Sequence, residues 1–184
     1  MARERAFFLT EEDRFFEEVP RLFAANQARE STRYEAVIYA LKPQATSDAV
    51  KRVAAFVGAP QPRETEAVAR ALNQAIATSQ YPSAQALLEF KGLGIDLPLA
   101  TALVHFFRPA FPLYRVEAVA SLQALGYAVE HRTTLDEEGL GAYEGVVAAI
   151  DRLKLRIPYP FVPESNCFLT RVVEGALVAR ALKL

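Results

Sequence analysis

The sequence is most informative about its fold between residues 81 and 126, YPSAQALLEFKGLGIDLPLATALVHFFRPAFPLYRVEAVASLQALG. Apolar residues recur at helical spacing over 83–90, over 98–107 and again from 113 to Gly126. The turn Lys91-Gly92-Leu93-Gly94 separates the first two of these segments, and the proline-bounded stretch 108–112 separates the second from the third. This order predicts a helix-hairpin-helix at about 83–107, followed by one more amphipathic helix.

A glycine turn of this kind is suited to holding a phosphate. Glycine adopts positive φ without strain and lets backbone N–H groups approach an anion closely. The first turn of the following helix is expected to add free N–H donors and the positive end of the helix dipole. The sequence therefore predicts an anion site at Lys91, Gly92, Leu93 and Gly94.

The remainder of the chain also has the apolar periodicity of helices, which predicts an all-α fold forming a single domain of two lobes over residues 1–184. Thr10 is expected to cap the first helix, and Pro20 to kink or stop it. Thr46 and Gly58 are predicted to cap a later helix at its two ends. The further expected helices span 32–42, 63–78, 140–153 and 167–182.

Composition limits the possible functions. The chain has 184 residues, of which 52% are hydrophobic, and this is enough for a sizeable core. One cysteine excludes an internal disulfide, and two histidines with one cysteine do not make a typical zinc site, so no metal is expected. The sequence contains neither a long uncharged apolar run nor the core of a signal peptide, which predicts a cytoplasmic protein without membrane contact.

Three motifs in order, Gly92-Leu93-Gly94, Ala100-Thr101-Ala102-Leu103 and Pro109-Ala110-Phe111-Pro112, resemble those of the helix-hairpin-helix DNA glycosylase superfamily. The resemblance is best over residues 81–126. It implies a two-lobed helical fold with a cleft facing double-stranded DNA. It also implies that hairpin carbonyls hold a monovalent cation when DNA is bound, with no other cofactor.

The chain departs from this family at the catalytic positions. The positions where the family has its catalytic aspartate are Tyr114 and Arg115, and the position of its lysine nucleophile falls at about Leu97 or Pro98. The spacing from Gly94 to the following alanine is longer than in the family, unless Asp96 takes the place of the second glycine. An aspartate facing a phosphate would repel it.

Several nearby side chains are candidates for a site at the mouth of the cleft. Tyr114 is a pocket candidate, because a phenol can stack on a base or donate a hydrogen bond, and it also fills the space of the missing acid. Glu117 is the nearest carboxylate, so Tyr114 and Glu117 are the weak catalytic candidates. His105 is either a satisfied core residue or a residue that lines the pocket near the base.

The charge of the chain bears on DNA binding. The net charge is −1, whereas strong nucleic-acid binders carry a basic surface that displaces counterions. Six basic residues are able to form a local basic face or to remain as scattered solvated charges. These six residues are Lys42, Lys51, Arg52, Lys91, Arg108 and Arg115.

Three hypotheses follow. The first is a DNA-binding protein of base-excision-repair type that recognises damaged or distorted duplex, with Lys91 to Gly94, Arg108 and Arg115 as contacts and with impaired catalysis. The second is an active glycosylase that releases an alkylated base, since positive charge on such a base already assists its departure. The third is a helical protein-interaction module. None of them defines an oligomeric state.

Overall fold

The computed structural model describes residues 9–40, 45–78, 84–157 and 169–184. Every regular element in these segments is a helix, which confirms the predicted all-α fold. None of these helices is long and apolar enough to span a membrane. In chain order the elements are α1 (Glu11–Ala40), α2 (Ser47–Val57), α3 (Thr65–Thr78), the 3-10 helix η1 (Ala84–Phe90), α4 (Leu97–Phe107), α5 (Val116–Ala124), α6 (Glu137–Lys154) and α7 (Leu169–Ala181).

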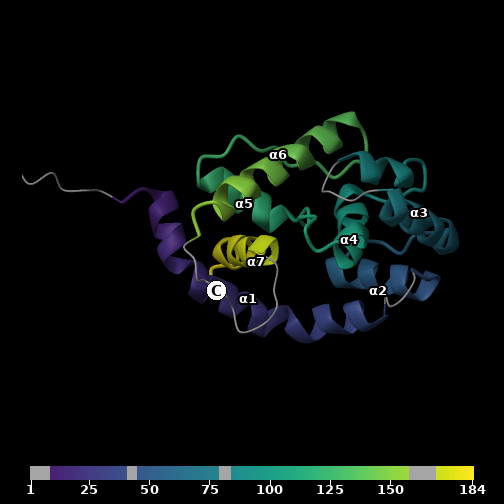
Figure 1. Ribbon diagram of the computed structural model, residues 1–184, viewed down its shortest axis with the longest axis horizontal. Helices are drawn as coiled ribbons and strands as arrows, with labels where there is room; N and C mark the ends of the chain where they lie inside the picture. Colours follow the sequence, from purple (N-terminus) through teal and green to yellow (C-terminus); the bar gives the residue numbers. More distant parts are fainter. Residues whose placement is uncertain (1–8, 41–44, 79–83, 158–168) are drawn as a thin grey trace, which may run out of the picture.

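The first helix is longer than the sequence suggested. Thr10 caps α1 by accepting from the amide of Asp13 at 3.1 Å, as predicted. The expectations of a stop at Pro20 and of a separate helix beginning at residue 32 were wrong, because α1 runs without interruption for 30 residues from Glu11 to Ala40. Pro20 lies on the exposed side, while the buried stripe continues past it from Val19 to Leu22. Packing of the inner face therefore holds the helix together where the proline removes one hydrogen bond. The first turns lie at an angle to the long remainder (Figure 1).

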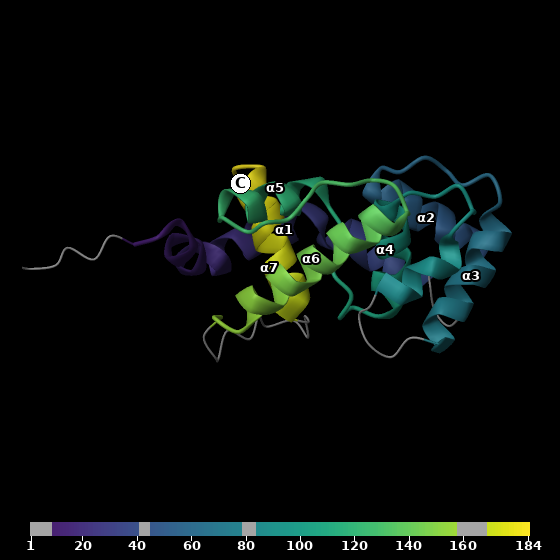
Figure 2. The same ribbon diagram turned by 90° about the horizontal axis from the view of Figure 1, so that it is seen from above.

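The helices pack in two groups. In one, α7 is surrounded by α1, α5 and α6, and in the other α4 packs against α2, α3 and η1 (Figures 1 and 2). The buried side chains of both groups form one continuous core. The division into two lobes stays a prediction.

Two predicted helix boundaries are confirmed at α2. The Thr46 side chain accepts from the amide of Ala49 at 3.2 Å, and Gly58 ends the helix with a φ of +72°. The segments predicted as helices over 63–78 and 140–153 correspond to α3 and α6. The last helix is observed from Leu169, and Cys167 lies outside the described residues.

The hairpin region differs in detail from the prediction. The residues expected as its first helix form the 3-10 helix η1, and α4 follows after a turn and an extended step. Gly92 and Gly94 have φ values of +81° and +68°, so the turn uses the conformation that favours glycine. The connection from α4 to α5 passes through residues 108–115, which brings Tyr114 and Arg115 to the start of α5.

Candidate functional site

The predicted cleft mouth is a hollow of about 360 Å³. It lies where the C-terminal end of α2 meets the N-termini of α4 and α5 and the segment 131–133, and we call it the α4–α5 hollow. Its ionisable lining residues are Asp96, Tyr114, Arg115, Glu117 and His131. The structure therefore brings the two weak catalytic candidates and Asp96 to one place.

Next in the chain before α4 lies the glycine turn, residues 91–95. Lys91, Gly92 and Gly94 are exposed. The amides of Gly92, Gly94 and Ile95 donate to no group in the described part of the chain. A Cβ built on either glycine meets nothing within 4 Å, so the space in front of the turn is open. The turn consequently offers unengaged backbone donors beside one exposed cation.

The N-terminus of α4 is different, and here the sequence-based expectation of free donors was wrong. Asp96 is the N-cap, and its carboxylate accepts from the Leu99 amide at 2.9 Å. The Leu97 amide donates to the Thr133 carbonyl at 2.8 Å, and Pro98 has no N–H to give. Because the amides of Leu97 and Leu99 already have partners and Pro98 has no N–H, the first turn of α4 presents no open anion site.

Arg115, at the position where the resemblance places the catalytic acid, is partly buried and held by ion pairs. It is the N-cap residue of α5, and its side chain is 16% exposed. The guanidinium donates to Glu30 of α1 at 2.7 Å and lies 3.7 Å from the carboxylate of Glu117. A guanidinium held in this way ties α5 to α1 instead of projecting toward a ligand.

Glu30 is the centre of a cluster that we call the buried polar junction, formed by Asn26 and Glu30 of α1 with Arg171 and Glu174 of α7. All four are buried. Arg171 donates to Glu30 at 2.9 Å and lies with its guanidinium carbon 4.5 Å from the centre of the Tyr34 ring. Burial alone would raise the pKa of Glu30, but the charge of Arg115 and the hydrogen bond from Arg171 lower it to about 2.

Glu174 has the opposite electrostatic environment. Burial raises its pKa to about 8, and the nearby Arg171 opposes only part of that effect. One carboxyl oxygen accepts from the amide of Leu113, in the segment leading to α5. The other oxygen has no hydrogen-bond partner among the described residues. Through Glu174, the junction thus anchors the connection between α4 and α5 to α7.

Neither catalytic candidate is placed as a general acid or base. The Tyr114 hydroxyl donates to the Glu130 carbonyl at 2.8 Å and accepts from the Arg132 amide at 2.7 Å. Burial raises the pKa of Tyr114, which keeps it protonated. Glu117 lies at the rim, where its carboxylate is 3.7 Å from the Arg115 guanidinium.

His105 has the position of a core residue. It is completely buried, its Nδ1 lies 2.6 Å from the Phe111 carbonyl and its Nε2 lies 2.9 Å from the Tyr34 hydroxyl. Burial lowers the pKa of His105 to about 3, so it is neutral at physiological pH. The ring connects α4 to α1 and does not line the α4–α5 hollow.

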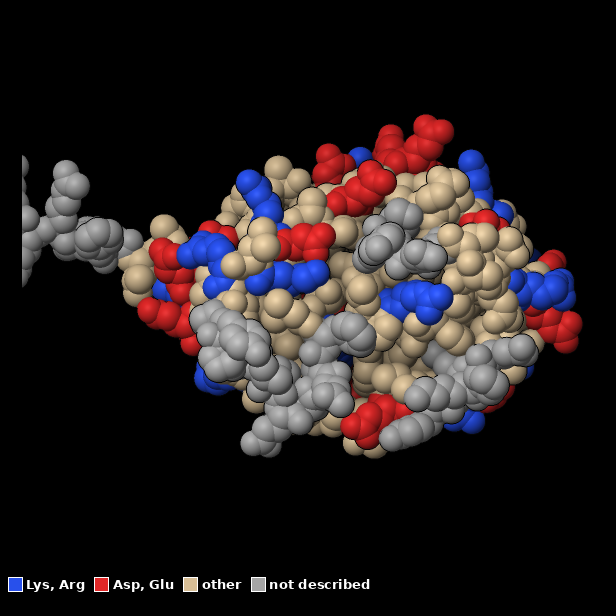
Figure 3. Space-filling model, viewed as in Figure 1, with Lys and Arg blue, Asp and Glu red and all other residues tan. Residues whose placement is uncertain are grey.

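The remaining basic candidates do not gather around the turn. Arg108 lies at the opposite end of α4 and donates to the Ile76 carbonyl of α3 at 3.0 Å, while Lys42 is outside the described residues. On the face in Figure 3, lysine and arginine are scattered among acidic residues, and no extended basic surface is visible there. Lys91 is therefore the predicted DNA contact with the most accessible charge.

Metal binding finds no support in the described segments, which contain no group of three or more histidine, cysteine, aspartate or glutamate side chains arranged to hold an ion. The monovalent cation at the hairpin stays a prediction.

Comparison of the chain with protein-family models, curated proteins and solved structures gives no match. The resemblance to helix-hairpin-helix glycosylases therefore stays a prediction that rests on the motifs of residues 81–126.

Two features of the site were missed by the sequence reasoning. The buried polar junction had a visible signal, because Arg171 and Glu174 lie three residues apart in a helix whose other residues near them are apolar. The capping role of Asp96 also had one, since an aspartate directly before a helix with proline in its first turn is a typical N-cap.

Proposed function

We propose that the protein binds duplex DNA without cleaving glycosidic bonds, and that the glycine turn holds a backbone phosphate. The observation that supports this most directly is the set of unengaged amides at Gly92, Gly94 and Ile95, exposed beside Lys91. Successive backbone N–H groups in a turn with positive φ make an anion-binding concavity. Contacts of this kind position a protein on DNA without reading its sequence.

The expected absence of catalysis follows from the contacts of three side chains in the α4–α5 hollow. Arg115 stands where a glycosylase of the resembled family has its acid, and it is ion-paired with Glu30. The Tyr114 hydroxyl is committed to two backbone groups. With Glu117 facing Arg115, none of these three residues is free to move a proton or stabilise a developing cation at a sugar. The resemblance thus supports the scaffold and not its chemistry.

The same site predicts weak, salt-sensitive binding. Affinity for DNA depends mainly on cations that displace counterions from phosphates. Lys91 is one such cation, while Asp96 lies close by and opposes it. We therefore expect the logarithm of the DNA affinity to fall only gradually with the logarithm of the salt concentration, because few phosphates are contacted.

A second candidate function is a helical protein-interaction module. It is favoured by the closed N-terminus of α4 and by Val116, an apolar side chain 55% exposed at the rim of the α4–α5 hollow. Single exposed apolar residues are common on soluble proteins, which makes this candidate the weaker one.

Titration of fluorescent duplexes at low and moderate salt tests the proposal. Gly94→Asp should weaken binding by about tenfold relative to Gly94→Asn. Both substitutions impose the same strain at a φ of +68°, and the space at the Cβ is open, so they differ chiefly in charge. Equal affinities of the two variants would remove the turn from the DNA contact.

Base release is followed in the same titrations with an alkylated duplex. The proposal expects no released base and no covalent complex trapped by borohydride, because the lysine position is empty. Release of a base would contradict the non-catalytic reading. Absence of binding at low salt, in a chain that is folded by circular dichroism, would favour the interaction module.

A further inference from the structure

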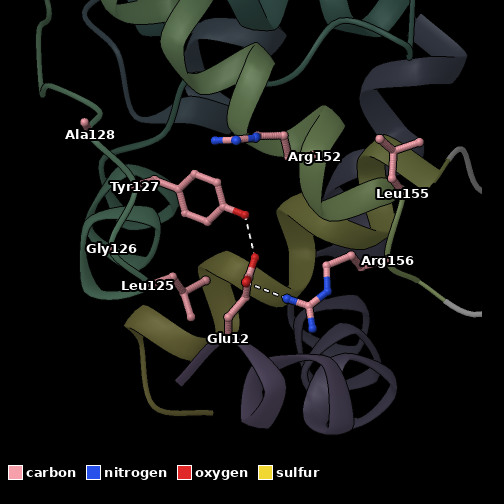
Figure 4. Close-up of a pocket in the computed structure, with 8 residues that line it drawn as sticks. All are labelled: Glu12, Leu125, Gly126, Tyr127, Ala128, Arg152, Leu155 and Arg156. Atoms are coloured by element: carbon pink, nitrogen blue, oxygen red, sulfur yellow. Dashed lines mark hydrogen bonds and ion pairs between the residues drawn. The ribbon is translucent and has the colours of Figure 1, made fainter. Parts of the chain in front are cut away.

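A second hollow lies at the other end of α5, and its chemistry is independent of the function proposed above. It has a volume of about 680 Å³ and is bounded by the start of α1, the connection from α5 to α6 and the C-terminal end of α6 (Figure 4). We call it the terminal hollow. Its lining residues are Glu12, Leu125, Gly126, Tyr127, Ala128, Arg152, Leu155 and Arg156.

The acidic and phenolic groups of this hollow are already engaged with one another. Glu12 accepts from the Tyr127 hydroxyl at 2.6 Å through one oxygen and from Arg156 through the other (Figure 4). Arg156 also donates to Asp13 at 2.7 Å and lies over the Phe16 ring at 4.4 Å. Burial and the Glu12 hydrogen bond raise the pKa of Tyr127 to about 12, so it remains a neutral donor.

The donors of the hollow, in contrast, are open. Arg152 forms no hydrogen bond or ion pair with any residue in the described segments, although its guanidinium extends over the hollow beside Tyr127 (Figure 4). The amide of Ala128 likewise donates to no described group. Since Glu12 and Arg156 neutralise each other, Arg152 leaves the lining with a net positive charge.

Two leucines also line the hollow, on opposite sides of it (Figure 4). Leu125 is partly buried, and Leu155, just beyond the end of α6, is 87% exposed. A hollow that holds an unpaired guanidinium together with apolar side chains suits a ligand that is charged at one end and apolar at the other.

We propose that the terminal hollow binds a small organic phosphate, with its oxyanion on Arg152 and the Ala128 amide and its apolar body against Leu125. A phosphomonoester has three terminal oxygens. It can accept two bonds from the planar guanidinium and still present a third oxygen to a backbone amide, whereas a carboxylate would have to share one of its two oxygens between the two donors.

A competing explanation is that Arg152 only complements the negative end of the α6 dipole. In that case the residue affects helix stability and binds nothing. The two explanations separate in a binding experiment with the full chain, since only a site responds to the ligand body.

Calorimetric titration with phenyl phosphate tests the proposal. We expect saturable binding that Arg152→Gln weakens by about tenfold or more. Arg70→Gln is the matched control, because Arg70 is exposed on α3, forms no ion pair among the described residues and loses the same charge. Leu125→Ala should weaken phenyl phosphate more than inorganic phosphate.

Three results would overturn the proposal. One is equal affinity of Arg152→Gln and the unmodified chain. Another is an equal loss in Arg70→Gln, which would mean nonspecific charge attraction. The third is equally strong binding of phenol, which would assign the hollow to apolar ligands alone. Because the Arg152 side chain has no described partner, its variant is expected to fold, and thermal unfolding verifies this.

Discussion

The buried polar junction and the glycine turn deal with charge in opposite ways. In the junction, Glu30 accepts from the guanidinium groups of Arg115 and Arg171. These charged side chains are therefore paired with one another. In the turn, the charged side chain is exposed and the binding capacity lies in backbone amides without partners. One region fixes the helices and the other is available to a ligand.

This difference changes how the arginines of the chain are interpreted. Arg108 and Arg115 are plausible DNA contacts from residue type alone. In the structure, however, each donates a hydrogen bond to a neighbouring helix, Arg108 to α3 and Arg115 to α1. A binding surface therefore cannot be inferred from the type of residue alone. It depends on whether the polar group still lacks a partner after the fold has formed.

The largest effect is expected from breaking the junction. Glu30→Ala leaves Arg115 and Arg171 without their buried carboxylate, and we expect the free energy of unfolding to fall by about 3–5 kcal/mol. Chemical denaturation measured by circular dichroism gives the value directly. Removing one partner of a buried ion pair is costly because the remaining charge stays desolvated.

Glu18→Ala is the matched control on the same helix. Its carboxylate is half exposed and pairs with Arg21 at 3.5 Å, so its loss should cost less than about 1 kcal/mol. Similar losses in the two variants would contradict the distinction between a structural junction and an ordinary solvated surface.

A smaller effect is expected from Glu174, seen as a pH dependence of stability. Its pKa of about 8 in the folded chain is above its ordinary value of 4.5, so the folded state binds the extra proton. Stability should therefore fall as the pH rises from about 4.5 through 8. Between pH 6.5 and 8 the neighbouring Glu30 and His105, with pKa values of about 2 and 3, do not titrate in the folded chain.

Measurement of unfolding free energy over this range, for the unmodified chain and for Glu174→Gln, isolates the contribution of Glu174, because the titration of His105 near pH 6.5 in the unfolded state is common to both proteins. We expect Glu174 to contribute a fall of about 1.4 kcal/mol per pH unit near pH 6.5, and about half of that slope near pH 8, where the group is half ionised in the folded chain. Glu174→Gln keeps an oxygen for the Leu113 amide and removes the titration, so its curve should be flatter. Parallel curves for the two proteins would show that Glu174 is not the group responsible.

Much of the fold was predictable because it depends on local signals. Thr46 and Gly58 marked both ends of α2, and the apolar spacing over 98–107 marked α4 as a helix. The continuity of α1 was not predictable in this way. A proline reads as a break unless one knows that it lies on the outer side of a helix whose inner side is packed along α7.

The site was harder to predict from the sequence, because its most important contacts join residues that are far apart in the chain. Arg115 and Glu30 lie 85 positions apart, and no periodicity relates them. The sequence located the glycine turn correctly, since its need for positive φ is local. It could not tell that the Thr133 carbonyl would take the Leu97 amide and help to close the end of α4.

The smallest effect is expected from removing the negative charge of Asp96, next to the glycine turn. Asp96→Asn keeps an N-cap side chain for the Leu99 amide and removes the negative charge beside the glycine turn. Because asparagine caps a helix about as well as aspartate, stability should change by less than about 0.5 kcal/mol. Affinity for duplex DNA should rise by a few-fold at low salt and converge with that of the unmodified chain as salt is added.

Asp151→Asn gives the same change in net charge at an exposed position at the far end of α6. It should leave DNA affinity nearly unchanged if the phosphate is held at the glycine turn. An equal gain in DNA affinity in both variants would mean that binding depends on the overall charge of the protein. It would contradict the assignment of the phosphate contact to the glycine turn. A gain confined to Asp96→Asn would place the phosphate within a few ångströms of the α4 cap, where local repulsion is strongest.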